Sequence, residues 1–496
     1  MSAPADLPLI PRPHSVRTGE GHLTLGPDAG VHAPAEIAEL VRETLDLTGA
    51  GADAPETADP TETAEIRLSL ADDPELGTEG YRLLVAADGV RGTAGTLAGL
   101  RWAVQTLRQL RGRDGRLPHV EIVDRPRYGW RGAHLDVARW CHPLPFLYRY
   151  VDLLALHKLN TLHLHLTDDQ GWRFEVQRYP RLTEVGGFRD GSSVGHSREG
   201  RTDDVPHGGY YSQRELRELV AHAARRGVRI MPEIDAPGHM QAAIAAYPWL
   251  GNDPERRLPV RREWGISRHV LNTSDRAVEF VRHVLDEVAD VFPFGYVHIG
   301  GDEVPPHEWA ASADAARRVA AEGLSGPEEL LGWWSRQLAD HLAGLGRRAA
   351  VWDELIEHGV PEGAAVFAWR GEKRVRRALA AGLDTVAAPE EFTYLDWAES
   401  DAPDEPLAIR GLLPLSKVYG YEPKDAVLGV QGQVWSEYLP TTELVEWRAF
   451  PRLAALAEVG WSAEERDFPA FHRRLTGHLP LLDALGVGYR PLDPIT

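Results

Sequence analysis

The chain contains a single cysteine, Cys141, so it can form no internal disulfide and its fold does not depend on an oxidising compartment. No window approaches the roughly 18 consecutive apolar residues that a membrane-spanning helix needs. The start, "MSAPADLPLIPRPHSV", has no basic leader followed by an apolar stretch of signal-peptide length. As written, the chain is therefore expected to be cytoplasmic, or secreted if a leader has been trimmed from it, and no membrane partner is expected.

Basic residues are in deficit, with 54 lysines and arginines against 74 aspartates and glutamates. The formal charge of -20 argues against a nucleic-acid or anionic-membrane surface, because such surfaces carry clustered lysine and arginine. An uncharged or cationic partner fits this chain better. With 496 residues, of which 43% are hydrophobic, the chain exceeds what one core usually supports, so two domains are expected.

The pattern of the chain changes near residue 127. Before it, short alternating runs such as "AEIRLSLADD" precede an apolar-periodic helix over residues 97–110. This pattern predicts a small α+β domain over residues 1–126. After it, strand-like runs alternate with helices such as those over 212–227, 274–292 and 441–457, which indicates a mostly parallel sheet in a second domain over residues 127–496.

Eight strand candidates occur in the second part of the chain, each ending in polar residues. They are "RGAHLDVAR", "NTLHLHLTDD", "VRIMPEID", "YVHIGGDE", "RAAVWDE", "AAVFAWR", "DTVAAPE" and "LGVQGQVWSE". Eight is the closing number of a (β/α)8 TIM barrel. The links after "VWDELIEHG" and "VAAPEE" lack a convincing helix, so we expect an irregular barrel with some helices missing.

Polar and aromatic side chains gather just past these predicted strands. They are Arg139, Asp168, Asp235, Asp302, Glu303, Trp352, Trp369, Trp435 and Glu437. Taken singly, an acid at a strand end often caps the next helix, and a tryptophan is more often core than ligand-facing. Together they mark the rim where such barrels carry their active sites. Aromatic faces beside carboxylates and a guanidinium suit a sugar, whose ring has apolar faces and hydroxyl edges.

The stretch "HIGGDEV", residues 298–304, places two acids side by side. Adjacent residues of a strand point to opposite faces, so the pair cannot confront one reacting atom from the strand itself. Retaining glycosidases hold two carboxyls about 5 Å apart across the bond, and inverting ones hold them about 6.5–9.5 Å apart. Neighbours at a strand terminus lie more naturally on one side of the sugar's reacting edge. The nucleophile then has to come from elsewhere, and a 2-acetamido group can supply its carbonyl oxygen.

These segments resemble glycoside hydrolase family 20, the β-N-acetylhexosaminidases, over nearly the whole chain. "HIGGDEV" is similar to the family's acid-pair motif, "LDVAR" to its sugar-gripping arginine segment, and "NTLHLHLTDDQGWR" and "MPEIDAPGHM" to its second- and third-strand segments. "VWDE", "AWR", "YLD" and "VQGQVWSE" are similar to its later loops, in the expected order. The leading α+β part also resembles the non-catalytic domain that commonly precedes this barrel.

The resemblance implies an exo-acting retaining enzyme that removes terminal N-acetylhexosamine through an oxazolinium intermediate. Glu303 is then the general acid and later the base, and Asp302 holds the acetamido N–H. Tyr394 is implied to hydrogen-bond the acetamido oxygen. The walls of the acetamido pocket are implied to be Trp352, Trp369 and Trp435.

Binding of the rest of the sugar is implied for a second group of residues. Arg139 and Glu437 would bind the far hydroxyls of the ring, and Asp396 the 6-hydroxyl. Asp168 and His239 would form a supporting network close to the acid. The partner is thus a carbohydrate with a terminal β-linked N-acetylhexosamine, of gluco or galacto configuration, and neither a cofactor nor a metal is implied.

Two alternatives remain open at this point. His163 and His165 share a face of one strand, and His-x-His in a barrel strand also begins the metal site of amide hydrolases, with His298, His239 and Asp302 as further ligands. Histidines that fill the barrel interior explain the same pattern. The other alternative is a sugar-binding barrel that has lost its chemistry, although it would have kept both acids.

Overall fold

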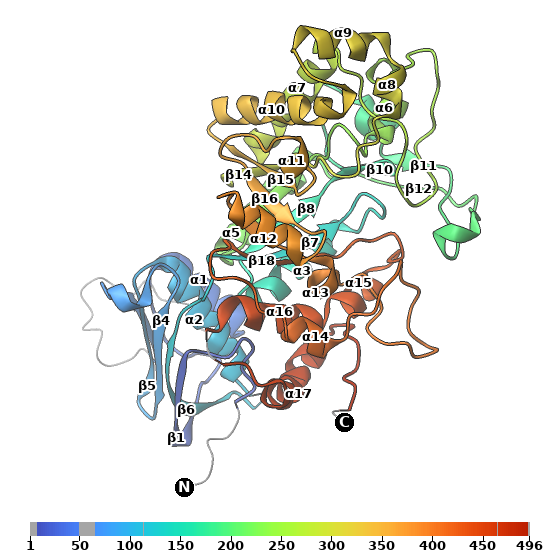
Figure 1. Cartoon of the computed structure of the whole chain (residues 1–496). Coiled ribbons are helices and arrows are strands. Elements are labelled where there is room, and N and C mark those ends of the chain that lie inside the picture. The colour runs from blue at the N-terminus through green and yellow to red at the C-terminus, as the bar shows by residue number, and fades with distance from the viewer. Residues whose placement is uncertain (1–6, 49–64, 113, 464, 495–496) are drawn as a thin grey trace.

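The computed structural model describes residues 7–48, 65–112, 114–463 and 465–494. Two units follow one another along the chain, a sheet domain at the N-terminus and a barrel after it (Figure 1). Within the described residues, no helix is both long enough and apolar enough to cross a bilayer.

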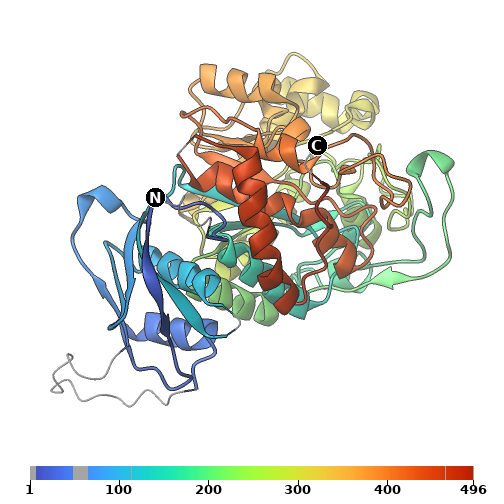
Figure 2. The same cartoon turned by 90° about the horizontal axis from the view of Figure 1, so that it is seen from below.

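The N-terminal unit is a six-stranded sheet with two helices. Its strands lie in the order β1-β6-β4-β5-β3-β2. The bounds are β1 Ser15–Thr24, β2 Val31–His32, β3 Ile66–Leu70, β4 Tyr81–Ala86, β5 Gly89–Ala94, β6 Arg116–Asp124, α1 Ala35–Thr44 and α2 Leu97–Leu110. The helix predicted over 97–110 is therefore confirmed as α2. Its apolar face packs on the sheet, and the helix lies between the sheet and the barrel (Figure 2).

Eight parallel strands close the barrel in the order β13-β14-β15-β16-β17-β18-β7-β8. Their bounds are β7 Trp130–Asp136, β8 Thr161–His165, β13 Arg229–Glu233, β14 Tyr296–His298, β15 Arg348–Trp352, β16 Ala365–Ala368, β17 Thr385–Ala387 and β18 Gly429–Gly432. The predicted fold class, a (β/α)8 barrel preceded by a small α+β domain, is confirmed. All eight carboxyl ends meet at one rim, where the polar residues that follow them converge.

The helices around the barrel are unequal in length. The longer ones are α3 Leu144–Leu156, α5 Gln213–Arg225, α7 Asp275–Val291, α9 Ala313–Ala321, α10 Leu330–Gly344, α12 Glu372–Ala380 and α17 Phe468–Ala484. The shorter ones are α4 Arg181–Glu184, α6 Gln241–Ala246, α8 His307–Ala311, α11 Leu355–His358, α13 Glu390–Thr393 and α14 Leu415–Tyr419. Since α11 and α13 follow β15 and β17, the two irregular links lie where the sequence predicts them.

The prediction of one continuous helix over residues 441–457 is wrong. This segment forms two helices, α15 Thr442–Ala449 and α16 Arg452–Trp461. Pro451 explains the break, because proline lacks the N–H that a continuing helix would donate and disfavours helical geometry in the residue before it.

A buried carboxylate joins the two units. Asp124, at the end of β6, accepts hydrogen bonds from Lys158 Nζ at 2.7 Å and Trp461 Nε1 at 2.8 Å, both in the barrel. It also accepts one from the Tyr81 hydroxyl at 2.7 Å, within its own domain. Because Asp124 and Lys158 are fully buried, losing either would leave an unpaired charge in the interface.

Candidate active site

A pocket of about 340 Å³ opens at the carboxyl ends of the barrel strands. Ten of the eleven residues that the family resemblance assigns to the site line it; Asp168 does not, and neither does the strand-end candidate Asp235. The ten are Arg139, His239, Asp302, Glu303, Trp352, Trp369, Tyr394, Asp396, Trp435 and Glu437. Side chains far apart in the sequence therefore meet in one cavity, as the strand-end pattern predicts.

The turn after β14 brings both acids of the pair into this pocket. Gly300 and Gly301 adopt positive φ values of 68° and 94°, and Glu303 follows with φ 49°. A Cβ atom at position 300 would lie 1.6 Å from Asp235 Oδ1, so only glycine fits there. The chain has left the extended conformation after His298. Asp302 and Glu303 therefore escape the alternation of a strand and both line the cavity.

His239 links the acid pair to the barrel. Its Nδ1 lies 3.1 Å from Asp168 Oδ1, and its Nε2 lies 3.7 Å from both Asp302 Oδ2 and Glu303 Oε2. Burial alone would lower the pKa of His239, but the carboxylates of Asp168 and Asp302 raise it well above its usual value. A protonated imidazole thus faces both acids. Asp168 does not itself line the pocket, but it contacts the pocket residues His239 and Arg139.

Arg139 forms the charged end of the pocket. Its guanidinium pairs with Asp168 at 2.8 Å and Asp136 at 3.2 Å, lies 4.0 Å from Glu437, and sits 5.1 Å from the centre of the Trp435 ring. Burial would lower the pKa of Arg139, yet Asp168 and Asp136 raise it well above its usual value. A fixed guanidinium and a carboxylate beside an aromatic face suit the hydroxyls of a sugar ring.

The aromatic walls are held by hydrogen bonds from their ring nitrogens. Trp352 Nε1 donates to Glu233 Oε1 at 2.8 Å, and Trp369 Nε1 donates to Glu354 Oε2 at 3.1 Å. Trp369 also stacks on Tyr394, with ring centres 5.8 Å apart and planes 22° from parallel. The walls are thereby rigid before any ligand enters.

Asp302 shares its surroundings with a second buried carboxyl, Asp235. Burial and the negative charge of Asp302 raise the pKa of Asp235 well above its usual value. Burial also raises the pKa of Asp302, while His239 opposes the increase. Asp302 Oδ2 lies 3.7 Å from His239 Nε2, so an ionised Asp302 has a cationic partner beside it.

The histidines of the metal alternative separate into different clusters. His163 and His165 lie inside β8 with fully buried side chains, as the interior reading predicts. Among the described residues, His163 groups with His134 and Glu233, whereas His239 groups either with Asp168 and Asp169 or with Asp235 and Asp302. The proposed ligand set is therefore not one constellation.

Several residues that line the pocket were not predicted from the sequence. Gly265, Ile266, Ile409 and Arg410 line the mouth, together with Trp397 from the "YLDWAES" loop. They come from long loops without regular periodicity, so no pattern marked them. Glu233 and Glu354, which hold the tryptophans, read as the end of a buried strand and the start of a helix.

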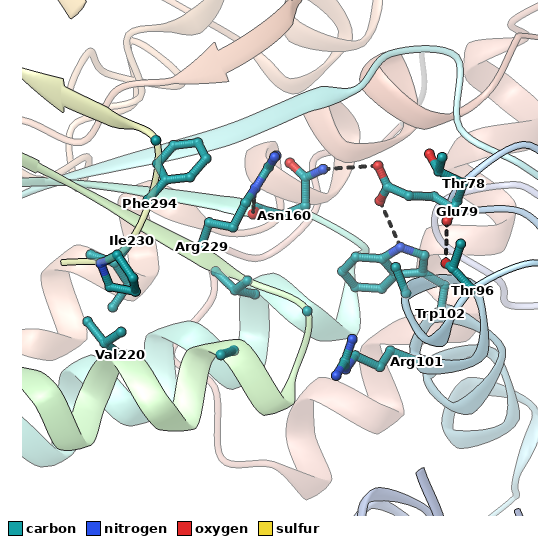
Figure 3. A pocket seen from close by; sticks show the side chains of 16 residues that line it. Thr78, Glu79, Thr96, Arg101, Trp102, Asn160, Val220, Arg229, Ile230 and Phe294 are labelled. Carbon is teal, nitrogen blue, oxygen red and sulfur yellow. Dashed lines mark hydrogen bonds between the residues drawn. The ribbon is translucent and has the colours of Figure 1, made fainter. Parts of the chain in front are cut away.

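A larger hollow of about 580 Å³ lies at the opposite edge of the barrel (Figure 3). It opens between the N-terminal domain and the starts of β8, β13 and β14, and includes Asn160, Arg229 and Phe294. Its polar groups already pair with one another, since Glu79 accepts from Asn160 at 3.4 Å and from Trp102 at 2.9 Å. Catalytic residues of such barrels lie at the other rim, so size does not identify the site.

Comparisons with known proteins agree with this geometry. The model of glycosyl hydrolase family 20, catalytic domain, matches residues 128–464, and the model of glycosyl hydrolase family 20, domain 2, matches residues 6–125. The β-hexosaminidase of Porphyromonas gingivalis is 37% identical over 436 residues, which cover 84% of this chain but only 55% of that protein. The β-hexosaminidase of Vibrio furnissii is 34% identical over 476 residues, which cover 92% of this chain and 77% of that protein.

A solved structure is similar over a comparable length. The family 20 exo-β-N-acetylglucosaminidase from Vibrio harveyi, in complex with N-acetylglucosamine, superposes with a TM-score of 0.86 at 32% identity. The match covers 98% of this chain and 78% of that one.

The buried acid Asp396 gives the fold a testable pH dependence. Burial, with Glu437 nearby, raises its pKa to about 8. An aspartate titrates near pH 3.9 when unfolded, so its contribution to stability is complete below about pH 4 and is lost as the pH rises through about 8. Asp396→Asn cannot ionise, and should therefore gain stability relative to wild type between about pH 5 and pH 9.

Unfolding midpoints of both proteins across this pH range provide the measurement. Asp404→Asn, exposed on the same loop, is the matched control. A constant difference between wild type and Asp396→Asn at every pH would contradict the assignment.

Proposed function

Because the chain belongs to glycosyl hydrolase family 20, we propose that it is a retaining, exo-acting β-N-acetylhexosaminidase that cleaves terminal non-reducing N-acetylhexosamine by substrate-assisted catalysis. One observation carries the proposal. Asp302 and Glu303 follow a double-glycine turn and line one pocket with four tryptophans. A pair on one side of the sugar suits a reaction whose nucleophile belongs to the substrate.

The first step breaks the glycosidic bond. Glu303 donates a proton to the leaving oxygen while the acetamido carbonyl oxygen attacks C1, which forms a cyclic oxazolinium ion. The carboxylate of Asp302 accepts the acetamido N–H and balances the positive charge that develops on the ring. The walls formed by Trp352 and Trp369 hold the acetamido group under C1, and such orientation lowers the barrier.

The second step releases the sugar. Glu303, now ionised, takes a proton from a water molecule, which attacks C1 from the side that the leaving group occupied. The bond between C1 and the oxazolinium oxygen breaks at the same time and restores the acetamido group. Two inversions at C1 give overall retention. The Glu303 side chain is 35% exposed, so water can reach it, whereas Asp302 is largely enclosed. This difference in exposure matches the two roles, since only the acid must exchange protons with solvent.

The remaining pocket residues are proposed to select the sugar. Arg139 and Glu437 bind the far hydroxyls of the ring, and Asp396 binds the 6-hydroxyl. Tyr394 donates its hydroxyl hydrogen to the acetamido oxygen. Its side chain is buried, and burial raises its pKa well above the usual value, so it keeps this hydrogen.

A panel of aryl glycosides tests the proposed function. Aryl 2-acetamido glycosides of gluco and galacto configuration should release the aryl alcohol, whereas matched 2-hydroxy glycosides lack the internal nucleophile and should be nearly unreactive. The initial rate of aryl alcohol release is the measurement. Comparable rates for both kinds of glycoside would rule out attack by the acetamido group, and no cleavage despite sugar binding would favour an inert sugar-binding barrel.

Glu303→Gln tests the general acid. The amide cannot donate an acidic proton, so turnover of a substrate with an unactivated leaving group should fall by at least about a hundredfold while sugar binding persists. Steady-state kinetics and calorimetric binding of N-acetylglucosamine separate the two effects. Glu308→Gln, an acid of α8 outside the pocket, is the control. Turnover of Glu303→Gln at the wild-type level would refute the role.

A further inference from the structure

Glu233 lies beneath the pocket at the end of β13, and its side chain is fully buried. Its Oε1 accepts a hydrogen bond from Trp352 Nε1 at 2.8 Å and lies 2.9 Å from His298 Nδ1. Its Oε2 lies 2.5 Å from His165 Nδ1 and 3.1 Å from His163 Nε2. Each oxygen of this carboxylate therefore meets two ring nitrogens, and the four rings come from β8, β14 and β15.

One oxygen of the Glu233 carboxylate, Oε1, holds Trp352, which forms part of the acetamido wall. Trp352 is the last residue of β15, and its side chain is 1% exposed while its ring lines the pocket. In so buried a place, an indole N–H without an acceptor would carry the full cost of desolvation. Glu233 Oε1 thus fixes the plane of the Trp352 ring.

The other oxygen of the Glu233 carboxylate, Oε2, is connected to the acid pair through His165, Asp168 and His239. His165 Nε2 lies 3.0 Å from Asp168 Oδ2, and Asp168 Oδ1 lies 3.1 Å from His239 Nδ1. His239 Nε2 in turn faces Asp302 and Glu303 at 3.7 Å. Hydrogen-bond contacts therefore run from Glu233 to His239, and ion-pair distances of 3.7 Å connect His239 to the reacting carboxyls.

Charges alternate along this chain. Burial would lower the pKa of His165, but Glu233 and Asp168 raise it to about 10, so the imidazole is protonated. Burial would raise the pKa of Glu233, but His298 and His165 hold it well below its usual value. Carboxylate, imidazolium, carboxylate and imidazolium follow one another from Glu233 to His239. His165 and Asp168 each lie between two groups of opposite charge, which favours one arrangement of the network.

We propose that Glu233 is a positioning residue that sets the acetamido wall and the orientation of the acid pair together, without touching the substrate. The inference rests on the proposed function of the pocket. Glutamine at this position has nearly the same shape but only one accepting oxygen, and its NH2 group would confront the N–H donors on the other side. Glu233→Gln can therefore satisfy the Trp352 side or the His165 side, but not both.

Two further variants separate the effect of Glu233 on Trp352 from its effect on the acid pair. Trp352→Phe keeps an aromatic wall but removes the N–H, so it should slow cyclisation and lower kcat alike for good and poor leaving groups. His165→Asn breaks the path to Asp168 and should lower kcat more for a poor leaving group, which depends on the acid. Glu233→Gln should show both effects, with a loss of roughly tenfold or more.

Glu458→Gln is the matched control, because Glu458 is also fully buried. Its carboxylate lies 2.6 Å from the Arg474 guanidinium, and neither residue lines the pocket. Glu458→Gln should alter the stability of the protein but not the ratio of kcat for a substrate with a good leaving group to kcat for one with a poor leaving group. The proposal is overturned if Glu233→Gln folds with wild-type kcat and ratio, or if Glu458→Gln shifts the ratio equally. Should Glu233→Gln not fold, wild-type kinetics in both Trp352→Phe and His165→Asn would overturn it.

The affinity for N-acetylglucosamine, measured by calorimetry, tests the effect of Glu233 on the Trp352 wall without requiring turnover. Weaker binding in Glu233→Gln and Trp352→Phe, but not in Glu458→Gln, supports the proposal even if wild type cleaves neither glycoside. Such inactivity would refute the proposed function alone. Unchanged affinity in both variants, together with an unchanged leaving-group ratio, would refute the role of Glu233.

Discussion

The turn between β14 and the acid pair determines what chemistry the pocket can perform. Gly300 packs so closely against Asp235 that no side chain fits, and Gly301 continues the left-handed path. Because of this turn, Asp302 and Glu303 face one cavity instead of opposite faces of a strand. Two neighbouring carboxyls can serve the leaving oxygen and a substituent of the same sugar. They are poorly arranged to lie on opposite sides of C1, and in the proposed reaction the substrate's own oxygen therefore attacks C1.

The second constraint is electrostatic. The pocket concentrates acids, yet the proposed reaction requires them to carry different charges, with Glu303 as the proton donor and Asp302 ionised. Buried cations make this possible, since His239 faces both members of the pair and Arg139 is held among Asp136, Asp168 and Glu437. Such a network is fixed before the substrate arrives, so little reorganisation accompanies charge development in the transition state.

Sequence patterns predicted the barrel and most of the site because both follow from local rules. Parallel strands end at one rim, so residues just past each strand, such as Arg139 and Glu303, could be grouped without knowing the packing. Glu233 was missed because "RIMPE" reads as an ordinary buried strand, and only the closed barrel shows that its carboxylate meets rings from three other strands. Ile266 and Arg410 lie on loops whose path depends on tertiary contacts, and the break at Pro451 was overlooked within an apolar pattern.

The central claim is that no side chain of the protein becomes bonded to the sugar. The intact mass of the protein, measured after rapid quenching during turnover of an activated aryl N-acetylglucosaminide, tests this most directly. The account predicts only the unmodified mass at every time point. A species heavier by one sugar residue, with the adduct located on any carboxylate of the chain, would contradict it.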